Sequence, residues 1–229
     1  MEVVNKLYYG DNLDVLRRYV HDESVDLIYL DPPFNSASTY NMLFRAPDGI
    51  SSPAQRKAFE DTWHWTTEAE TTFDDVMQSG RTRIAEILRA LRDCLGESDL
   101  TAYRVMLTIR LIELRRVLKP AGSIYLHCDP TASHYIKIIL DGVFGITSFK
   151  NEIIWRRSHA HSDGRQGSRH FGRISDTILF YTKGNTSIFN VQYVPYDPSY
   201  VARDYRRQEP GGRRYRLDNI LGTGWCRER

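Results

Sequence analysis

The fold is decided by residues 25–34, which read Val25-Asp26-Leu27-Ile28-Tyr29-Leu30-Asp31-Pro32-Pro33-Phe34. The first six residues are almost wholly apolar, β-branched and aromatic, which predicts a strand buried on both faces of a parallel sheet. Proline fixes φ and lacks an N–H group, so the two prolines must leave the sheet as a stiff turn. In open α/β sheets, ligands bind beyond the carboxyl ends of the strands. The stretch therefore places one carboxylate and one aromatic ring where such folds keep their ligand sites.

The composition is that of an ordinary globular protein. The 229 residues are 41% hydrophobic and 26% charged, enough for one large domain or a domain with an appendage. No apolar run approaches the ~18 residues of a membrane span, and the start lacks the pattern of a signal peptide. The three cysteines lie far apart without a Cys-x-x-Cys pair, so free thiols in a reducing cytoplasm are expected.

Charge is distributed unevenly along the chain. Residues 151–229 hold 14 Lys or Arg against 8 Asp or Glu, whereas residues 1–150 hold 17 against 21. An acidic-to-neutral front and a basic back suggest a catalytic body with a region that faces a polyanion. On charge alone, a solvated basic face is an equally open interpretation.

Local signals predict the elements near the first strand. Residues 6–9 are expected to form a short strand, followed by a helix with Asp11 or Asn12 as its N-cap. Such a strand–helix–strand unit predicts parallel pairing. Residues 35–80 are polar, irregular and rich in aromatic side chains, and are expected either to cover the site or to pack on the body.

Further elements are expected after residue 80. The predicted helices are Arg81–Leu95, a helix capped by Ser98 that ends at Leu118 and is closed by 119–122, and Ala132–Val143. The predicted strands are Ser123–Cys128, Asn151–Trp155 and Asp176–Lys183. The last two flank a basic loop at 158–173 and are expected to pair antiparallel at the sheet edge. No element is predicted beyond Asn190.

The turn Asp31–Phe34 is suited to holding an exocyclic amine. The Asp31 carboxylate and the backbone carbonyl of Pro32 can both accept hydrogen bonds from one –NH2 group, and Phe34 can stack on the ring that bears it. Two acceptors aim the nitrogen lone pair outward, as an in-line attack on a methyl sulfonium requires. Neither a covalent enzyme intermediate nor a metal is needed for that step.

Several segments resemble the amino-methylating DNA methyltransferases, which move a methyl group from S-adenosylmethionine (AdoMet) to adenine N6 or cytosine N4. Besides Asp31–Phe34, the similar segments are Leu7–Asn12, Glu113–Gly122, His127–Pro130, Asn151–Trp155 and Asp176–Lys183. They span roughly residues 5–184, in the order of the group whose catalytic motif lies near the N-terminus. The resemblance implies an α/β, Rossmann-like methyltransferase sheet, mostly parallel with an antiparallel edge hairpin.

The resemblance also implies a function and a set of site residues. Aspartate at the first motif position favours adenine N6, because the cytosine N4 enzymes more often carry serine there. The implied catalytic residues are Asp31, Pro32, Pro33 and Phe34, and the implied AdoMet-binding residues are Asp11, Asn12 and Asp31. Asp11 could instead be only a helix cap. Cytosine N4, RNA and a free nucleotide stay open as targets, because Asp31 excludes none of them.

The resemblance implies double-stranded DNA as the partner, with the target base flipped out of the stack. It also allows a cognate restriction nuclease as a second partner and a homodimer as the assembly. Basic residues near the late hairpin and in the tail are expected to contact DNA: Arg156, Arg157, Arg165, Arg169, Arg173, Arg206 and Arg207. No metal site is predicted, because no Cys or acid is spaced to complete one with His159, His161 and His170.

The sequence departs from the pattern of this family near its C-terminal end. The group carries a late Asp-Pro-Phe-x-Gly-x-Gly motif for AdoMet, and no such motif precedes Arg229. The expected organisation is a catalytic domain at 1–190 that is incomplete at the C-terminus, with the 35–80 insertion near the site, and the start of a target-recognition or tail region at 191–229. A catalytically inactive DNA-binding fragment is therefore the alternative to an enzyme.

Overall fold

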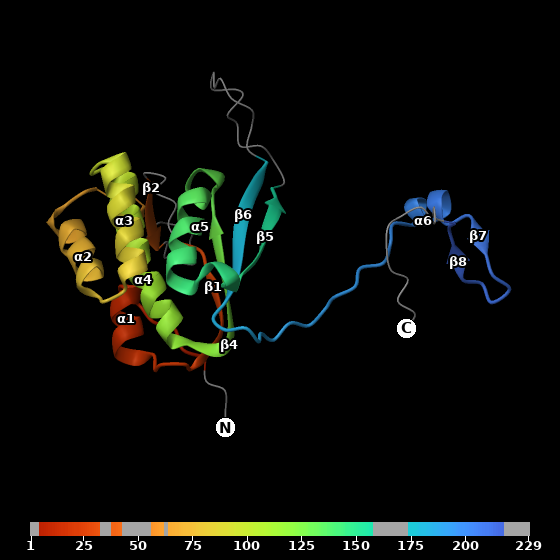
Figure 1. The fold of residues 1–229 in the computed structure, drawn as a ribbon, viewed down its shortest axis with the longest axis horizontal. Helices are drawn as coiled ribbons and strands as arrows, with labels where there is room; N and C mark the ends of the chain where they lie inside the picture. Colours follow the sequence, from red (N-terminus) through yellow and green to blue (C-terminus); the bar gives the residue numbers. More distant parts are fainter. Residues whose placement is uncertain (1–4, 33–37, 43–55, 62–63, 158–173, 218–229) are drawn as a thin grey trace, which may run out of the picture. The chain divides into compact units, whose positions relative to one another are not determined.

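The computed structural model of the protein describes residues 5–32, 38–42, 56–61, 64–157 and 174–217 (Figure 1). The chain divides into two units, residues 1–188 and 189–229. The first unit holds a four-stranded sheet with helices packed against it, and the second holds short elements. Within the described ranges, no helix is both long and apolar enough to cross a membrane.

Four strands form the main sheet of the first unit, in the order β1-β4-β6-β5. Their bounds are Val25–Leu30 for β1, Leu118–Cys128 for β4, Phe149–Arg156 for β5 and Ser175–Thr182 for β6. β1 pairs with β4 in parallel, whereas β6 pairs antiparallel with both β4 and β5. Three of these four strands therefore run in the same direction. This confirms the predicted α/β sheet with an antiparallel hairpin at its edge.

β1 lies at the opposite edge of this sheet, and the two sides of the strand differ in burial. Ile28 is 9% exposed, whereas Leu27 and Tyr29 are 58% and 57% exposed. Successive side chains of a strand point to opposite faces, so only one face of β1 is covered by the described chain. The prediction of a strand buried on both faces is wrong, because apolar composition does not specify how many neighbours cover a strand.

Residues 6–9 form no strand, contrary to the prediction, and Leu7 is fully exposed. The parallel neighbour of β1 is instead β4, which lies far later in the chain. The predicted strand–helix–strand unit is therefore not formed. A strand needs backbone hydrogen bonds to a second strand, and the composition of four residues does not show whether such a neighbour is present.

Among the described residues of the first unit, five α-helices pack together, and their bounds are Asn12–Tyr19 for α1, Thr67–Gln78 for α2, Thr82–Leu95 for α3, Asp99–Val117 for α4 and Pro130–Phe144 for α5. α4 is central and contacts the other four, and Figure 1 shows α4 and α5 alongside the sheet. The core joins fully buried side chains of β4 and α5, among them Ile124, Leu126, Ile136, Ile139 and Leu140. Each such side chain contributes roughly 1.5–3 kcal/mol relative to an exposed position.

The predicted helix ends are confirmed to within two residues for α3, α4 and α5. The Ser98 hydroxyl accepts a hydrogen bond from the backbone N–H of Thr101 at 3.3 Å and caps α4. Asp129 caps α5, because its Oδ1 accepts from the N–H of Ala132 at 2.9 Å. Ser98 is the cap that the sequence predicts for α4, whereas the capping role of Asp129 was not predicted.

The segment 35–80 is more regular than predicted. It contains an antiparallel hairpin of β2 (Ser38–Met42) and β3 (Arg56–Asp61), followed by α2. Thr66 caps α2, which buries Phe73 and Val76 three residues apart. The prediction of irregular structure is wrong because only these two side chains of α2 are buried, so the helical stripe is weak in a polar sequence.

β4 begins at Leu118, so residues 119–122 belong to the strand and do not close the preceding helix as predicted. A register shift between Val25 and Leu27 of β1 accommodates the longer strand. Gly122 suits this place, because a Cβ there would lie 2.8 Å from the Leu118 side chain. Proline and glycine are disfavoured inside strands, so Pro120 and Gly122 predict a break here. Pairing with the neighbouring strand nevertheless keeps them in β4.

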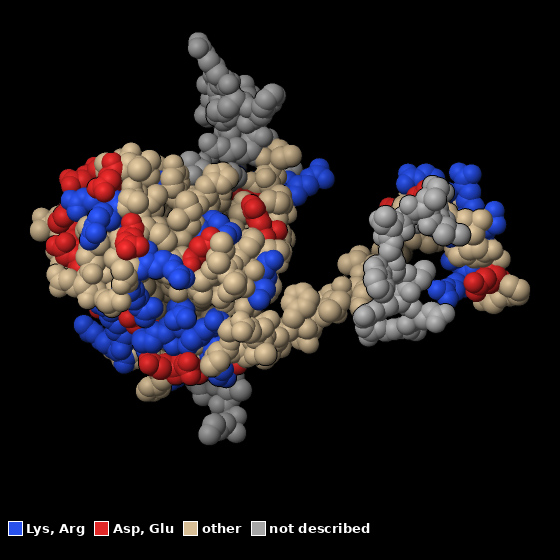
Figure 2. All heavy atoms as spheres, viewed as in Figure 1, with Lys and Arg blue, Asp and Glu red and all other residues tan. Residues whose placement is uncertain are grey.

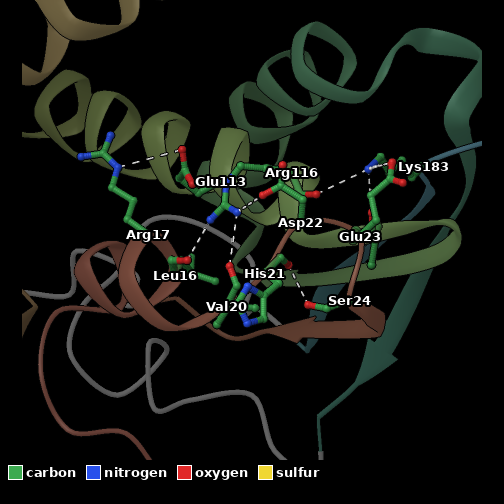
Figure 3. Close-up of polar contacts among 11 residues, drawn as sticks. Leu16, Arg17, Val20, His21, Asp22, Glu23, Ser24, Glu113, Arg116 and Lys183 are labelled. Carbon is green, nitrogen blue, oxygen red and sulfur yellow. Dashed lines mark hydrogen bonds and ion pairs between the residues drawn. The ribbon is translucent and has the colours of Figure 1, made fainter.

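Arg116 ties the segment before β1 to the end of α4 (Figure 3). Its guanidinium donates to the backbone carbonyl oxygen of Leu16 at 2.8 Å and to that of Val20 at 3.2 Å. It also donates to the carboxylates of Glu113, at 2.6 Å, and Asp22. An arginine with several fixed acceptors holds the end of α1 and the following loop in one arrangement.

Lys183, just after β6, reaches the same loop (Figure 3). Its Nζ donates to Glu23 at 3.0 Å and to the backbone carbonyl oxygen of Leu118 at 2.7 Å. The start of β1 is thus anchored to α4, β4 and β6 together.

The second unit contains α6 (Pro198–Asp204) and a short antiparallel pair, β7 (Arg207–Gln208) and β8 (Arg214–Tyr215). No element was expected there. None of its described residues is buried, although Tyr196, Tyr200 and Tyr205 pack with ring centroids 5.7 to 6.3 Å apart. Basic side chains are prominent on this unit in Figure 2, whereas acidic and basic side chains are mixed on the visible face of the first.

Candidate active site at the carboxyl edge of the sheet

Asp31 and Pro32 directly follow β1, at the edge of the sheet where β4 and β5 also end. The Asp31 side chain is 59% exposed, whereas Pro32 is buried. Proline has no N–H to continue the ladder with β4, so the chain leaves the sheet at this point. The carboxylate is thus presented at the carboxyl end of the strand. Pro33 and Phe34 lie outside the described residues.

His127, the penultimate residue of β4, contacts Asp31. The distance from His127 Nδ1 to Asp31 Oδ1 is 3.0 Å. Leu30 pairs with Leu126 in the parallel ladder, so the next residue of each strand lies beside the other and on the same face. An ionised carboxylate can only accept a hydrogen bond, so His127 Nδ1 is the donor.

Asp176 and Arg157 continue this row of polar side chains across the sheet. Asp176 Oδ2, near the start of β6, lies 3.5 Å from His127 Nε2 and 2.9 Å from Arg157 Nε. The Asp176 side chain is only 7% exposed, and a buried carboxylate needs such a cationic partner. The row therefore begins at the exposed Asp31 and becomes progressively better shielded from water toward Asp176.

Neither His127 nor Asp176 is among the site residues predicted from the sequence. A signal was available for His127, because it is a polar side chain near the carboxyl end of a predicted apolar strand, the kind of position that borders ligand sites. Asp176 begins its predicted strand and carries no such signal. What the sequence lacks is the strand order that brings the two ends beside β1. Among the residues that the structure describes, no group of three or more His, Cys, Asp or Glu side chains is placed to hold a metal ion.

Asp11 and Asn12 lie at the start of α1 and share a partner on α4. Asp11 Oδ1 accepts from the backbone N–H of Leu13 at 2.7 Å, so Asp11 is the N-cap that was one of its two expected roles. Arg110 donates to Asp11 Oδ2 at 2.6 Å and to Asn12 Oδ1 at 2.8 Å. A part in cofactor binding stays a prediction for both.

A cavity of about 380 Å³ lies beside Asp11, between α1, α2 and α4. Its size is within the range of small-molecule sites, roughly 300–1,000 Å³. The cavity is lined by the charged groups Asp11, Asp14, Glu68 and Arg110, together with polar and apolar side chains of α2 and α4. Carboxylates suit a ligand that carries hydroxyl groups and a positive charge. In size and donor chemistry, this lining fits a molecule such as AdoMet.

The comparison with known sequences identifies the family. A family model described as DNA methylase, for the N6 and N4 enzymes, matches residues 25–225. The chain belongs to this DNA methylase family.

Two curated relatives are longer than this chain. The type III restriction-modification enzyme StyLTI Mod subunit of Salmonella typhimurium is 27% identical over 199 residues, which cover 86% of this chain and 26% of that protein. The type II methyltransferase M.EcaI of Enterobacter cloacae is 26% identical over 221 residues, which cover 96% and 38%. The chain thus spans well under half the length of these relatives.

A solved structure, the PvuII DNA methyltransferase (cytosine-N4-specific), is also similar to this methylase. It aligns with a TM-score of 0.45 and 14% sequence identity, covering 85% of this chain and 60% of that one.

The basic residues predicted to contact DNA are spread over the methylase chain. Arg156 is exposed at the end of β5, whereas the guanidinium of Arg157 faces Asp176. Arg206 and Arg207 are exposed in the second unit. Arg165, Arg169 and Arg173 lie outside the described residues, as do His159, His161 and His170. Contact with DNA stays a prediction for all seven arginines.

Cys128 ends β4 next to His127, but its thiol has no access to solvent. Burial is the main reason why the pKa of the Cys128 thiol rises to about 12. A thiolate is the reactive form of cysteine, so this residue is chemically inert near neutral pH. Cys94 and Cys128 are both free thiols, as predicted, and Cys226 lies outside the described residues.

Proposed function

We propose that the protein transfers a methyl group from AdoMet to the exocyclic N6 amine of adenine in DNA. The observation that carries this proposal is the position of Asp31 and Pro32 at the carboxyl end of β1 in a member of the DNA methylase family. The relatives, which are named as Mod subunits of restriction-modification enzymes and as a methyltransferase, support the same reaction class.

Asp31 and Pro32 supply the contacts that the amine needs. The carboxylate of Asp31 and the backbone carbonyl of Pro32 each accept one N–H hydrogen bond, which holds the nitrogen in place and directs its lone pair away from both acceptors. Asp31 is exposed, so a base that enters from solvent can reach it. The new N–C bond would form as the methyl C–S bond of the sulfonium breaks, with the electron pair of that bond remaining on sulfur. The amine then carries the positive charge, which Asp31 is placed to stabilise before it receives the departing proton.

AdoMet, when bound, supplies the electrophilic methyl group. Asp11 and Asn12 at the start of α1 are the residues we propose to hold it, because Asp11 lines the cavity between α1, α2 and α4. Arg110 keeps both side chains in position from α4. Each oxygen of the Asp11 carboxylate already accepts one hydrogen bond, and its remaining lone pairs are the acceptors proposed for ribose hydroxyl or ammonium groups.

Double-stranded DNA is the proposed partner, because an amine inside a duplex cannot reach Asp31 unless the base is flipped out of the stack. Arg156 and the exposed arginines of the second unit are proposed to contact phosphates. A restriction subunit is a proposed protein partner, since relatives of this chain are named as Mod subunits of restriction-modification enzymes. A homodimer is a further proposal.

The test is a methylation assay with the full chain, radiolabelled AdoMet and DNA from a methylation-free host, followed by nucleoside analysis by mass spectrometry. We expect N6-methyladenine, and a loss of at least about 100-fold in the Asp31→Ala variant, in the range of positioned acid–base groups. Asp26→Ala is the matched control, because Asp26 is an exposed aspartate of the same strand that pairs with Lys119. N4-methylcytosine would overturn the adenine assignment, and full activity of Asp31→Ala would overturn the mechanism.

A further inference from the structure

His127 sits between two carboxylates at the edge of the sheet. Its Nδ1 is 3.0 Å from Asp31 Oδ1, and its Nε2 is 3.5 Å from Asp176 Oδ2. The side chain of His127 is 18% exposed, against 59% for Asp31. The ring thus joins the exposed carboxylate of the proposed reaction to a buried and fixed one.

An exposed carboxylate after the end of a strand needs such a partner if it is to act at a defined position. The torsion that turns the carboxylate plane is broad, so the two oxygens of Asp31 have no strongly preferred direction of their own. A hydrogen bond from His127 to Oδ1 selects one orientation. It leaves Oδ2 as the oxygen that accepts from the substrate amine.

A second carboxylate, which is buried, lies on the other side of the histidine ring. Asp176 is 7% exposed, and Arg157 Nε lies 2.9 Å from the same Oδ2 that faces His127. Arg157 is fixed in turn, because its backbone N–H donates to the carbonyl oxygen of Ile174 at 2.8 Å. The row of contacts therefore reaches from Asp31 on β1 past β4 and β6 to the end of β5.

We propose that His127 is a positioning residue for the methyl transfer: it donates from Nδ1 to Asp31 and holds that carboxylate in the orientation that accepts the amine. The Asp176 carboxylate lies on the other side of the ring, 3.5 Å from Nε2. This inference rests on the proposed function, because it requires Asp31 to receive the amine.

The experiment measures kcat and the KM values for AdoMet and DNA in the full chain and in three variants. His127→Ala is expected to lower kcat by about 10- to 100-fold, as a misplaced catalytic group does, while both KM values change by no more than about twofold. His127→Asn places an amide N–H near the position of Nδ1 and is expected to recover most of kcat. His134→Ala, an exposed histidine of α5, is the control and should keep wild-type values.

The outcomes separate the positioning role from a structural one and from the proposed function. If His127→Ala keeps full kcat, or if His127→Asn is as slow as His127→Ala while melting at the wild-type temperature, the positioning role is refuted. If Asp31→Ala keeps activity, the proposed function fails first. Loss of activity in Asp31→Ala with full activity in His127→Ala would leave the proposed function standing and remove only this inference.

Discussion

Replacing Arg157 with alanine separates two roles for this side chain, an ion pair inside the first unit and a contact with DNA. In the structure its Nε lies 2.9 Å from Asp176 Oδ2, and the Asp176 side chain is 7% exposed. Alanine at position 157 would leave that carboxylate shielded from water without its guanidinium. We therefore expect the variant to lose stability, and to keep most of its affinity for DNA.

The magnitude follows from the burial of the two partners. Removing one partner of a fully buried ion pair costs about 3–5 kcal/mol. The Arg157 side chain is 28% exposed, so water can reach the gap, and we expect a reduced cost of about 1–3 kcal/mol. One kcal/mol shifts the melting temperature of a domain of this size by roughly 2–4 °C, so a decrease of about 2–12 °C is expected.

Differential scanning calorimetry and DNA binding at fixed salt measure the two effects. Arg156→Ala is the matched control, because Arg156 is the exposed neighbour at the end of β5. It should melt within about 1–2 °C of the wild type, as surface substitutions do. Adding Asp176→Asn to Arg157→Ala should recover part of the loss, because it removes the buried charge. An unchanged melting temperature together with a larger loss of DNA affinity than in Arg156→Ala would refute the ion-pair interpretation.

Two further predictions concern buried titratable groups. The Tyr181 hydroxyl donates to Asp141 at 2.7 Å, and burial with this hydrogen bond raises the pKa of Tyr181 well above its usual 10. The folded state then keeps a proton that the unfolded state releases above pH 10. The free energy of unfolding should therefore fall by up to about 1.4 kcal/mol per pH unit above pH 10. In Tyr181→Phe, urea titrations at several pH values should show a smaller fall in the free energy of unfolding per pH unit. Iodoacetamide labelling followed by peptide mapping should modify Cys94 and spare Cys128 in the folded protein, and equal labelling of the two would contradict the burial of β4.

The helices show what local information can determine. Ser98 and Asp129 are caps whose hydrogen bonds involve residues three positions away, so the starts of α4 and α5 follow from the sequence to within two residues. The helix α2 was not predicted, because only Phe73 and Val76 are buried on it and the apolar pattern of its sequence is weak. The prediction of a strand at 6–9 is wrong for a different reason: a strand forms only where a second strand pairs with it, and the local sequence does not show whether one does.

The residues of the candidate site can be divided in the same way, into those placed by local sequence and those placed by pairing between distant segments. That Asp31 and Pro32 follow a strand can be predicted from the chain, because the apolar run and the prolines are contiguous and their effect on the backbone is local. That His127, Asp176 and Arg157 form a row leading to Asp31 depends on how the strands assemble. Strand order and register depend on pairing between distant segments, and a shift of one residue would turn His127 to the other face of the sheet.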